Sequence, residues 1–423
     1  MIDIEQPLTA TRGAIPSLRA NFAWTFAGNV LYGACQWGML SVLAKLGSPS
    51  IVGQFTLGLA VAAPVFMFTN LQLRAVQATD VNVEHGFANY FTLRLLATLL
   101  GLTVIVAVLP FAGASSAVRV VVLLVSVSKC VECMSDVTAG LLQREEQLKR
   151  VAISLMVRGA ASVLVFSLTF AYFRNLALSV AAMCGVWLAV LALYDVPNVR
   201  ALIGSQTPFF RFDRRALGRL MMLGLPLGWV ATFASLNMNI PRYFLQHYLG
   251  LADQGIFAAL AYLVIVINLV IVALSVSVTT RLARMFADGD RRQFVRLLAK
   301  LSMLGVLIAA VGAPLTFLVG RSLLTLLYRR EYADHVGLLA LFVGIAGLST
   351  IGSFLTSGLT AARAFRVQPL IYFVAMLIGV AASALLVPRW GLIGAAIAVL
   401  FSAMIVVLGC LWQMYKVLRT ASQ

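Results

Sequence analysis

The chain has 423 residues, of which 61% are hydrophobic and 11% charged, with a mean hydropathy of +0.96 and a net charge of +17. Soluble domains carry about 25% charged residues, and β-barrels show ten-residue alternation, so long apolar runs exclude both classes and predict a polytopic helical membrane protein. The basic excess is typical of cytoplasmic loops that face anionic lipid, and without a soluble domain we expect no nucleic-acid partner.

Twelve apolar runs, each near the ~20 residues that cross a bilayer, predict twelve membrane spans. The segment before the first run contains Asp3, Glu5 and Pro7 and no apolar region, so we expect the first span to act as its own insertion signal. The predicted spans are 22–44, 52–72, 92–111, 118–142, 151–172, 176–195, 219–241, 255–279, 298–319, 336–358, 369–387 and 392–414.

Lysine and arginine are distributed unevenly over the predicted loops. The termini and the even-numbered loops hold 22 of them, whereas the odd-numbered loops hold eight. Positive charge accumulates on the cytoplasmic side of membrane proteins. This asymmetry predicts that both termini and the even-numbered loops are cytoplasmic.

Two features of the first half of the chain recur in the second half. They are Gly47…Gly53-x-Phe55 with Gly250…Gly255-x-Phe257, and Arg74 with Arg281 at the ends of spans 2 and 8. An even number of spans in each half gives parallel repeats, an architecture of alternating-access transporters. We therefore expect an all-α fold with two pseudo-symmetric six-helix lobes. The divisions are an N-terminal cytoplasmic segment 1–21, an N-lobe 22–195, a cytoplasmic linker 196–216, a C-lobe 217–415 and a cytoplasmic tail 416–423.

Amide and basic side chains mark both repeats. In span 1, Asn29, Tyr32 and Gln36 share one helical face, and Asn237 and Asn239 are their expected counterparts in span 7. They either join helices by hydrogen bonds or line a wet cavity. The basic residues at the span ends either anchor the interface or ring the two mouths of a path for phosphate. These are Lys45 and Arg242 at the outer ends, and Arg74 and Arg281 at the inner ends.

Span 4 carries three charges on one face, namely Lys129, Glu132 and Asp136, and span 5 carries Arg158. Charges at membrane depth are costly unless they are paired or hydrated. Lys129 and Glu132 can pair within the helix. Asp136 and Arg158 lie equally far from the cytoplasmic edge, so we predict that they form an ion pair. The group is either a structural network that joins spans 4 and 5 or a site of proton or cation coupling.

The sequence lacks the motifs of ATP binding, metal binding and nucleophilic catalysis. The chain contains no GxxxxGK[ST] loop, so ATP is not the expected direct energy source, and no cofactor is expected. Cys130-x-x-Cys133 has half the spacing of a zinc site but no companion ligands, so no metal is expected either. No nucleophile–base arrangement is present. We therefore expect a protein that is not an enzyme.

The stretch 21–80 carries a family resemblance. It contains Gly28-Asn29, Gln36-Trp37, Ala44-Lys45-Leu46-Gly47, Val52-Gly53-Gln54-Phe55, Ala63-Pro64 and Asn70-Leu71-Gln72-Leu73-Arg74. This stretch resembles the Wzx-type flippases of bacterial polysaccharide biosynthesis, which serve O-antigen lipopolysaccharide and exopolysaccharide production. They belong to the multidrug/oligosaccharidyl-lipid/polysaccharide (MOP) exporter superfamily. The resemblance is strongest over about the first 100 residues and continues as a pattern of spans.

The resemblance implies a flippase of the bacterial inner membrane. Its substrate would be an undecaprenyl-pyrophosphate-linked oligosaccharide repeat unit, moved by alternating access. A polysaccharide polymerase and a chain-length regulator are the implied partners. In this family, spans 1, 2, 7 and 8 line the cavity. Carried onto this chain, the implied substrate path comprises Asn29, Tyr32, Gln36, Lys45, Arg74, Asn237, Asn239, Arg242 and Arg281.

Three other functions stay open at this point. A cation-coupled multidrug exporter of the same superfamily would share the fold, although such exporters generally use acids in spans 1 or 7, where this chain has none. A membrane glycosyltransferase or polymerase would need a large external loop, which the predicted spans do not leave. A membrane scaffold that recruits partners through basic loops is the third alternative. The sugar, the coupling ion and the oligomeric state are left undecided.

Overall fold

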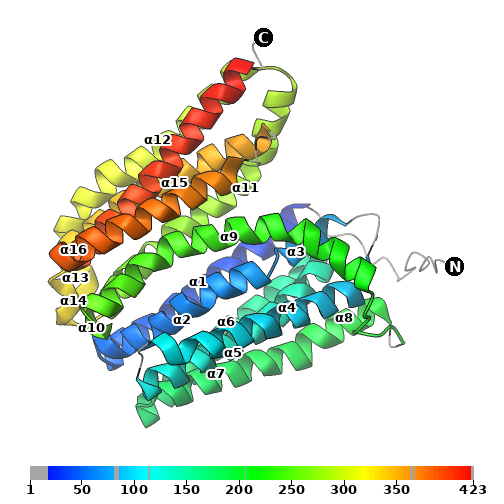
Figure 1. Cartoon of the computed structure of the whole chain (residues 1–423), viewed down its shortest axis with the longest axis horizontal. Helices are drawn as coiled ribbons and strands as arrows, with labels where there is room; N and C mark the ends of the chain where they lie inside the picture. The colour runs from blue at the N-terminus through cyan, green and yellow to red at the C-terminus, as the bar shows by residue number, and fades with distance from the viewer. Residues whose placement is uncertain are drawn as a thin grey trace. The chain divides into compact units, whose positions relative to one another are not determined.

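The computed structural model describes residues 18–80, 85–112, 115–204, 206–362, 364 and 367–420 (Figure 1). All regular secondary structure within these ranges is helical, which confirms the predicted all-α class. Most of the predicted N-terminal segment 1–21 lies outside the described residues. The helices are α1 (Leu18–Leu46), α2 (Pro49–Thr69), α3 (Leu73–Thr79), α4 (Phe87–Val108), η1 (Leu109–Ala112), α5 (Ser116–Arg144), α6 (Leu148–Phe173), α7 (Leu176–Val190), η2 (Leu191–Asp195), α8 (Val196–Ile203), α9 (Arg214–Tyr248), α10 (Leu251–Leu263), α11 (Ile265–Ala287), α12 (Arg291–Leu307), η3 (Ile308–Gly312), α13 (Ala313–Leu327), α14 (Arg330–Ala333), α15 (Val336–Ala361) and α16 (Gln368–Thr420).

Most of each predicted span is helical, but residues 70–72 of the second span and Val264 of the eighth span are turns. Among the described residues, eight continuous helical stretches are long and apolar enough to cross a membrane. One of them, α16, contains both of the last two predicted spans. The loop expected between those spans is instead a kink, where Gly391 has a φ of 55° and a ψ of −128°. Glycine adopts this backbone conformation without a Cβ clash.

The chain divides into two compact units, which we describe separately. Unit 1 comprises residues 1–36 and 65–228, and unit 2 comprises residues 37–64 and 229–423. Helices α1, α2 and α9 are therefore each divided between the units, with one part in unit 1 and the other part in unit 2. The lobe limits derived from the sequence repeat stay a prediction.

In unit 1, helix α5 packs against α3, α4, α6 and α7. An apolar cluster in this unit joins the α2–α3 connection and the start of α3 to α4, α5 and the start of α9. A second cluster holds the connection between α8 and α9, because Phe209 packs there against Phe87 and Val199. Helix α9 begins after Asp213, whose carboxylate accepts hydrogen bonds from the N–H groups of Ala216 and Arg215, and these bonds lower its pKa.

In unit 2, helix α15 is the central element and packs against α11, α12, α13 and α16. The repeated glycines of the sequence meet in this unit. A Cβ on Gly53 of α2 would lie 1.9 Å from the Leu251 carbonyl oxygen, and one on Gly255 of α10 would lie 2.0 Å from the Pro49 carbonyl oxygen. Beside them, Gln254 Nε2 donates to Thr56 Oγ1 at 3.2 Å. The repeat motif therefore allows two helix backbones to cross at close range.

Candidate functional site

The connection from α2 to α3 in unit 1 has an unusual backbone. Leu71 and Gln72 have φ values of 48° and 49°, a left-handed conformation that costs of order 1–3 kcal/mol for a residue with a side chain. On the α9 side, a Cβ on Gly224 would lie 2.6 Å from the Leu71 carbonyl oxygen. The glycine in α9 therefore makes room for the turn, and other contacts must hold the turn in place.

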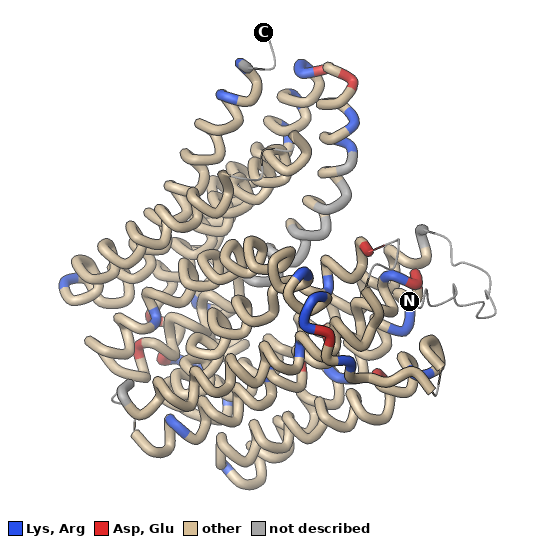
Figure 2. Tube along the Cα trace, turned by 45° about the vertical axis from the view of Figure 1, so that its right-hand side comes forward, with Lys and Arg blue, Asp and Glu red and all other residues tan. Residues whose placement is uncertain are grey.

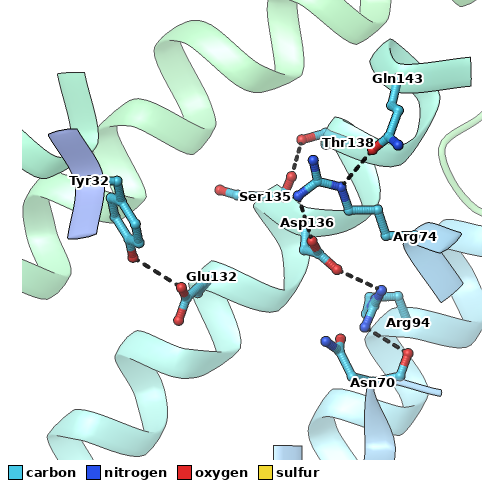
Figure 3. A network of polar contacts seen from close by, with 9 residues as sticks. All are labelled: Tyr32, Asn70, Arg74, Arg94, Glu132, Ser135, Asp136, Thr138 and Gln143. Carbon is cyan, nitrogen blue, oxygen red and sulfur yellow. Dashed lines mark hydrogen bonds and ion pairs between the residues drawn. The ribbon is translucent and has the colours of Figure 1, made fainter. Parts of the chain in front are cut away.

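A charged network supplies those contacts (Figure 3). Arg94 of α4 is fully buried, and its Nη1 donates to the Asn70 carbonyl oxygen at 2.9 Å. Its Nη2 lies 3.1 Å from Asp136 Oδ2, and Arg74 Nη1 lies 3.3 Å from Asp136 Oδ1. Arg74 Nε also donates to Gln143 Oε1 at 3.1 Å. One carboxylate thus binds two guanidinium groups, which lie on either side of the left-handed turn. We call the group of Asp136, Arg74 and Arg94 the Asp136 clamp.

The clamp corrects a prediction made from the sequence. Asp136 does not pair with Arg158, although the two residues were placed at equal depth; it pairs with Arg74 and Arg94. Depth does not determine the direction in which a helix face points. Asp136 points toward α3 and α4, whereas Arg158 of α6 lies against Tyr32 of α1 and Trp187 of α7. Arg94 lies inside predicted span 3 but has no charged neighbour at helical spacing there, so the sequence alone does not single it out.

A second polar cluster lies around Glu132, toward α1 (Figure 3). Tyr32 Oη donates to Glu132 Oε1 at 3.0 Å, and Lys129 Nζ pairs with Glu132 Oε2, as predicted for the i, i+3 spacing. The Arg158 guanidinium lies 5.1 Å from the centre of the Tyr32 ring and 5.7 Å from that of Trp187. In the described part of the chain, the Nε and Nη1 atoms of Arg158 have no hydrogen-bond partner. The span 4 charges therefore form two groups rather than one network.

The amides of the predicted substrate path have different surroundings. Asn29 is exposed and donates to the Thr25 carbonyl oxygen of its own helix at 2.8 Å. Gln36 is half-buried. In unit 2, Asn237 Nδ2 donates to the Tyr372 carbonyl oxygen at 3.2 Å, while its Oδ1 is buried and has no partner among the described residues. Asn239 Oδ1 accepts a hydrogen bond from Arg242 Nη1 at 3.3 Å.

The basic residues of the predicted path also differ from one another. Lys45 Nζ donates to the carbonyl oxygens of Thr325 at 3.2 Å and Leu326 at 2.8 Å, so it binds the last turn of α13. Arg281 is exposed on α11. Arg242 is only 7% exposed and lies 5.8 Å from the Tyr262 ring. No carboxylate of the described residues forms an ion pair with Arg242, so it is a buried cation without a counter-ion.

A known protein is similar to this chain in sequence, and solved structures are similar to it in fold. No family model matches the chain. The capsular polysaccharide biosynthesis protein CapF of Staphylococcus aureus is 26% identical over 392 residues, which cover 90% of this chain and 95% of that protein. An inward-facing multidrug resistance MATE family transporter of the MOP superfamily has a TM-score of 0.70 at 13% identity, covering 93% and 94% of the two chains. The lipid II flippase MurJ in an inward closed conformation has a TM-score of 0.71 at 12% identity, covering 92% and 86%.

Proposed function

We propose that this chain, a polytopic membrane protein with the fold of the MOP superfamily transporters, is a flippase for lipid-linked oligosaccharides. The observation that carries the proposal is the match to a capsular polysaccharide biosynthesis protein along nine-tenths of the chain. The proteins that share the fold are transporters and a lipid flippase rather than enzymes. A membrane glycosyltransferase or polymerase is therefore not retained as an alternative.

The substrate we propose is an undecaprenyl-pyrophosphate-linked repeat unit of an exported polysaccharide. Its pyrophosphate is anionic and must cross a ~30 Å apolar layer, so groups of the protein must replace its water. Arg242 fits this need because it is buried, cationic and without an acidic partner among the described residues. A guanidinium can bind phosphate oxygens bidentately. The unpartnered Oδ1 of Asn237 lies on the same helix and could accept a hydrogen bond from a sugar hydroxyl.

The remaining residues of the proposed substrate path serve the same ligand. In unit 1, Asn29, Tyr32, Gln36 and Arg74 are proposed to contact it, and Lys45, Asn239 and Arg281 in unit 2 complete the set. The proposed location is the bacterial inner membrane with both termini in the cytoplasm, on the basis of the lysine and arginine asymmetry. A polysaccharide polymerase and a chain-length regulator are the proposed partners, since the flipped unit must be assembled outside.

The test is the leaflet accessibility of labelled lipid-linked sugar in cells without the protein. Loss of the protein is expected to trap the sugar on the cytoplasmic side, and the wild-type chain is expected to restore exposure on the outer side. Arg242→Gln should restore at most about a tenth of it, because a lost charged hydrogen bond to phosphate costs about 1.5–3 kcal/mol. Arg321→Gln is the matched control, since Arg321 makes only an exposed 3.9 Å pair with Asp334. Normal outer-leaflet exposure in the deletion strain would contradict the proposal.

A cation-coupled multidrug exporter is the second candidate, because a MATE family transporter has nearly the same TM-score as MurJ. The acids of the described spans that could serve such coupling are Glu132 and Asp136 in α5 and the buried Asp195 in η2, and none lies in α1 or α9. Glu132 and Asp136 are the two that form ion pairs. Resistance of cells to organic cations separates the candidates: dependence on the protein and on Glu132 would favour the exporter, and sugar accessibility would then be unchanged.

A further inference from the structure

A basic cavity of about 440 Å³ opens in unit 2 at the membrane-surface end of α12. It is lined by Arg291, Arg292 and Arg296 together with Val295, Ala299 and Leu418. Leu418 comes from the last turns of α16, so two helices form the walls. Lys and Arg gather at this end of α12 and at the end of α16 (Figure 2). None of the residues proposed to contact the oligosaccharide lines this cavity.

Two acids, Asp288 and Asp290, precede the three arginines in the sequence, so this end of α12 keeps a net positive charge. None of them forms an ion pair with a described carboxylate, and the lining contains no acid. The nearest acid in sequence, Asp290, has its Oδ1 engaged as the cap of α12, where it accepts from Gln293 N at 3.0 Å. Three arginines line this open, mainly apolar hollow, and arginine favours an anion with several oxygen atoms, such as a phosphate.

The apolar lining continues into the membrane. Ala299 lies one turn after Arg296, at the start of predicted span 9. Met303 and Leu307 follow at helical spacing in α12, and Val311 lies beyond them in η3. Met303 is 64% exposed, Leu307 55% and Val311 54%. At 1.5 Å per residue, the strip from Ala299 to Val311 is about 18 Å long, close to the ~15 Å depth of one leaflet. A ligand that fills both the arginine-lined cavity and the apolar strip beside it has an anionic head and an apolar chain.

We infer that this cavity is a binding site for an anionic phospholipid. The phosphate would lie among Arg291, Arg292 and Arg296, and an acyl chain would follow the exposed face of α12. Basic pockets at helix ends on the cytoplasmic side commonly hold such headgroups. In the orientation proposed above, the lipid belongs to the cytoplasmic leaflet. The inference goes beyond the proposed function and does not need it, because a membrane protein of any activity could hold this lipid.

The test compares lipid binding to the full-length protein in detergent, by native mass spectrometry with phosphatidylglycerol and with phosphatidylcholine. Wild-type protein is expected to retain phosphatidylglycerol preferentially. Replacing the three lining arginines by glutamine should lower that affinity by about tenfold or more, since each basic residue near a lipid surface contributes about 1 kcal/mol. The control removes the same charge elsewhere, by Arg211→Gln, Arg214→Gln and Arg215→Gln, and should change affinity by less than about twofold, because these residues do not line the cavity.

A second variant keeps the charges and fills the apolar wall. Ala299 is exposed, so Ala299→Trp should leave folding intact, as a thermal melt can show, and should weaken phosphatidylglycerol binding. Soluble pyrophosphate serves as the competitor that lacks an acyl chain. Equal affinity in the arginine variant, or an equal loss in the control, would overturn the site. Full displacement by pyrophosphate with no effect of Ala299→Trp would overturn the lipid assignment and leave a site for free phosphates.

Discussion

Arg94 in unit 1 and Arg242 in unit 2 are both buried arginines of membrane helices, yet their surroundings are opposite. Arg94 is 0% exposed and binds the Asp136 carboxylate and the Asn70 carbonyl oxygen. Arg242 is 7% exposed, and its guanidinium contacts neutral groups, namely the Asn239 amide oxygen and the Tyr262 ring. A buried charge without compensation is costly. The charge of Arg94 is therefore compensated within the protein, whereas that of Arg242 is available for the anionic substrate proposed above.

The repeat-related pair Arg74 and Arg281 shows the same asymmetry. Arg74 shares the Asp136 carboxylate and binds Gln143, while Arg281 lies exposed on α11. The two residues occupy equivalent places in the sequence repeat. Arg74 lies in the first turn of α3 and Arg281 lies inside α11, so the repeat preserves neither the place of the arginine in its helix nor what its charge binds.

Removing the acid of the clamp should have the largest effect. Asp136→Ala leaves Arg94 buried without its ion pair and releases the left-handed turn, so we expect a loss of about 3 kcal/mol in the free energy of unfolding. Chemical denaturation in detergent measures it. Arg158→Gln should not rescue the variant, because Arg158 does not contact Asp136. Rescue by that second change would contradict the clamp.

The crossing of α2 and α10 should be next in sensitivity. Gly255→Ala places a Cβ 2.0 Å from the Pro49 carbonyl oxygen, so the two helices must separate, with an expected loss of about 1–3 kcal/mol. Gly185→Ala is the matched control, because a Cβ there meets no atom within 4 Å. Thermal unfolding of both variants gives the comparison. Equal melting temperatures would show that the crossing relaxes without cost.

Arg242 should respond in the opposite direction from Arg94. Arg242→Met removes an uncompensated buried charge, so we expect a gain of about 1 kcal/mol in stability together with loss of polysaccharide export. Arg94→Met should lower stability, because it leaves the Asn70 carbonyl oxygen and Asp136 without this partner. Unfolding curves and export are measured on the same preparations and strains. A destabilised Arg242→Met variant would assign that residue a structural role.

Lys45 should give the smallest effect. Its ammonium group is exposed and binds the last carbonyl oxygens of α13, so Lys45→Met should cost about 0.5 kcal/mol. Export at normal protein level should fall, because Lys45 is proposed to belong to the substrate path. Normal export in this variant would remove Lys45 from that path and leave it as a cap of α13.

The sequence determined the class, the spans and one internal ion pair. Hydropathy alone locates helices, because only a helix satisfies its own backbone in lipid. The i, i+3 spacing of Lys129 and Glu132 was sufficient to predict their contact, since both lie on one helix. The repeated glycines also marked a real feature, the close crossing at Gly53 and Gly255.

Only the tertiary structure decided which charges meet across helices. Asp136 and Arg158 matched in depth, but the rotation of α5 about its axis turns Asp136 toward Arg94 and Arg74. That rotation follows from packing of the whole unit, which no local spacing encodes. The same holds for Arg242: its position in a span was visible in the sequence, whereas its isolation from every described carboxylate depends on how the surrounding helices pack.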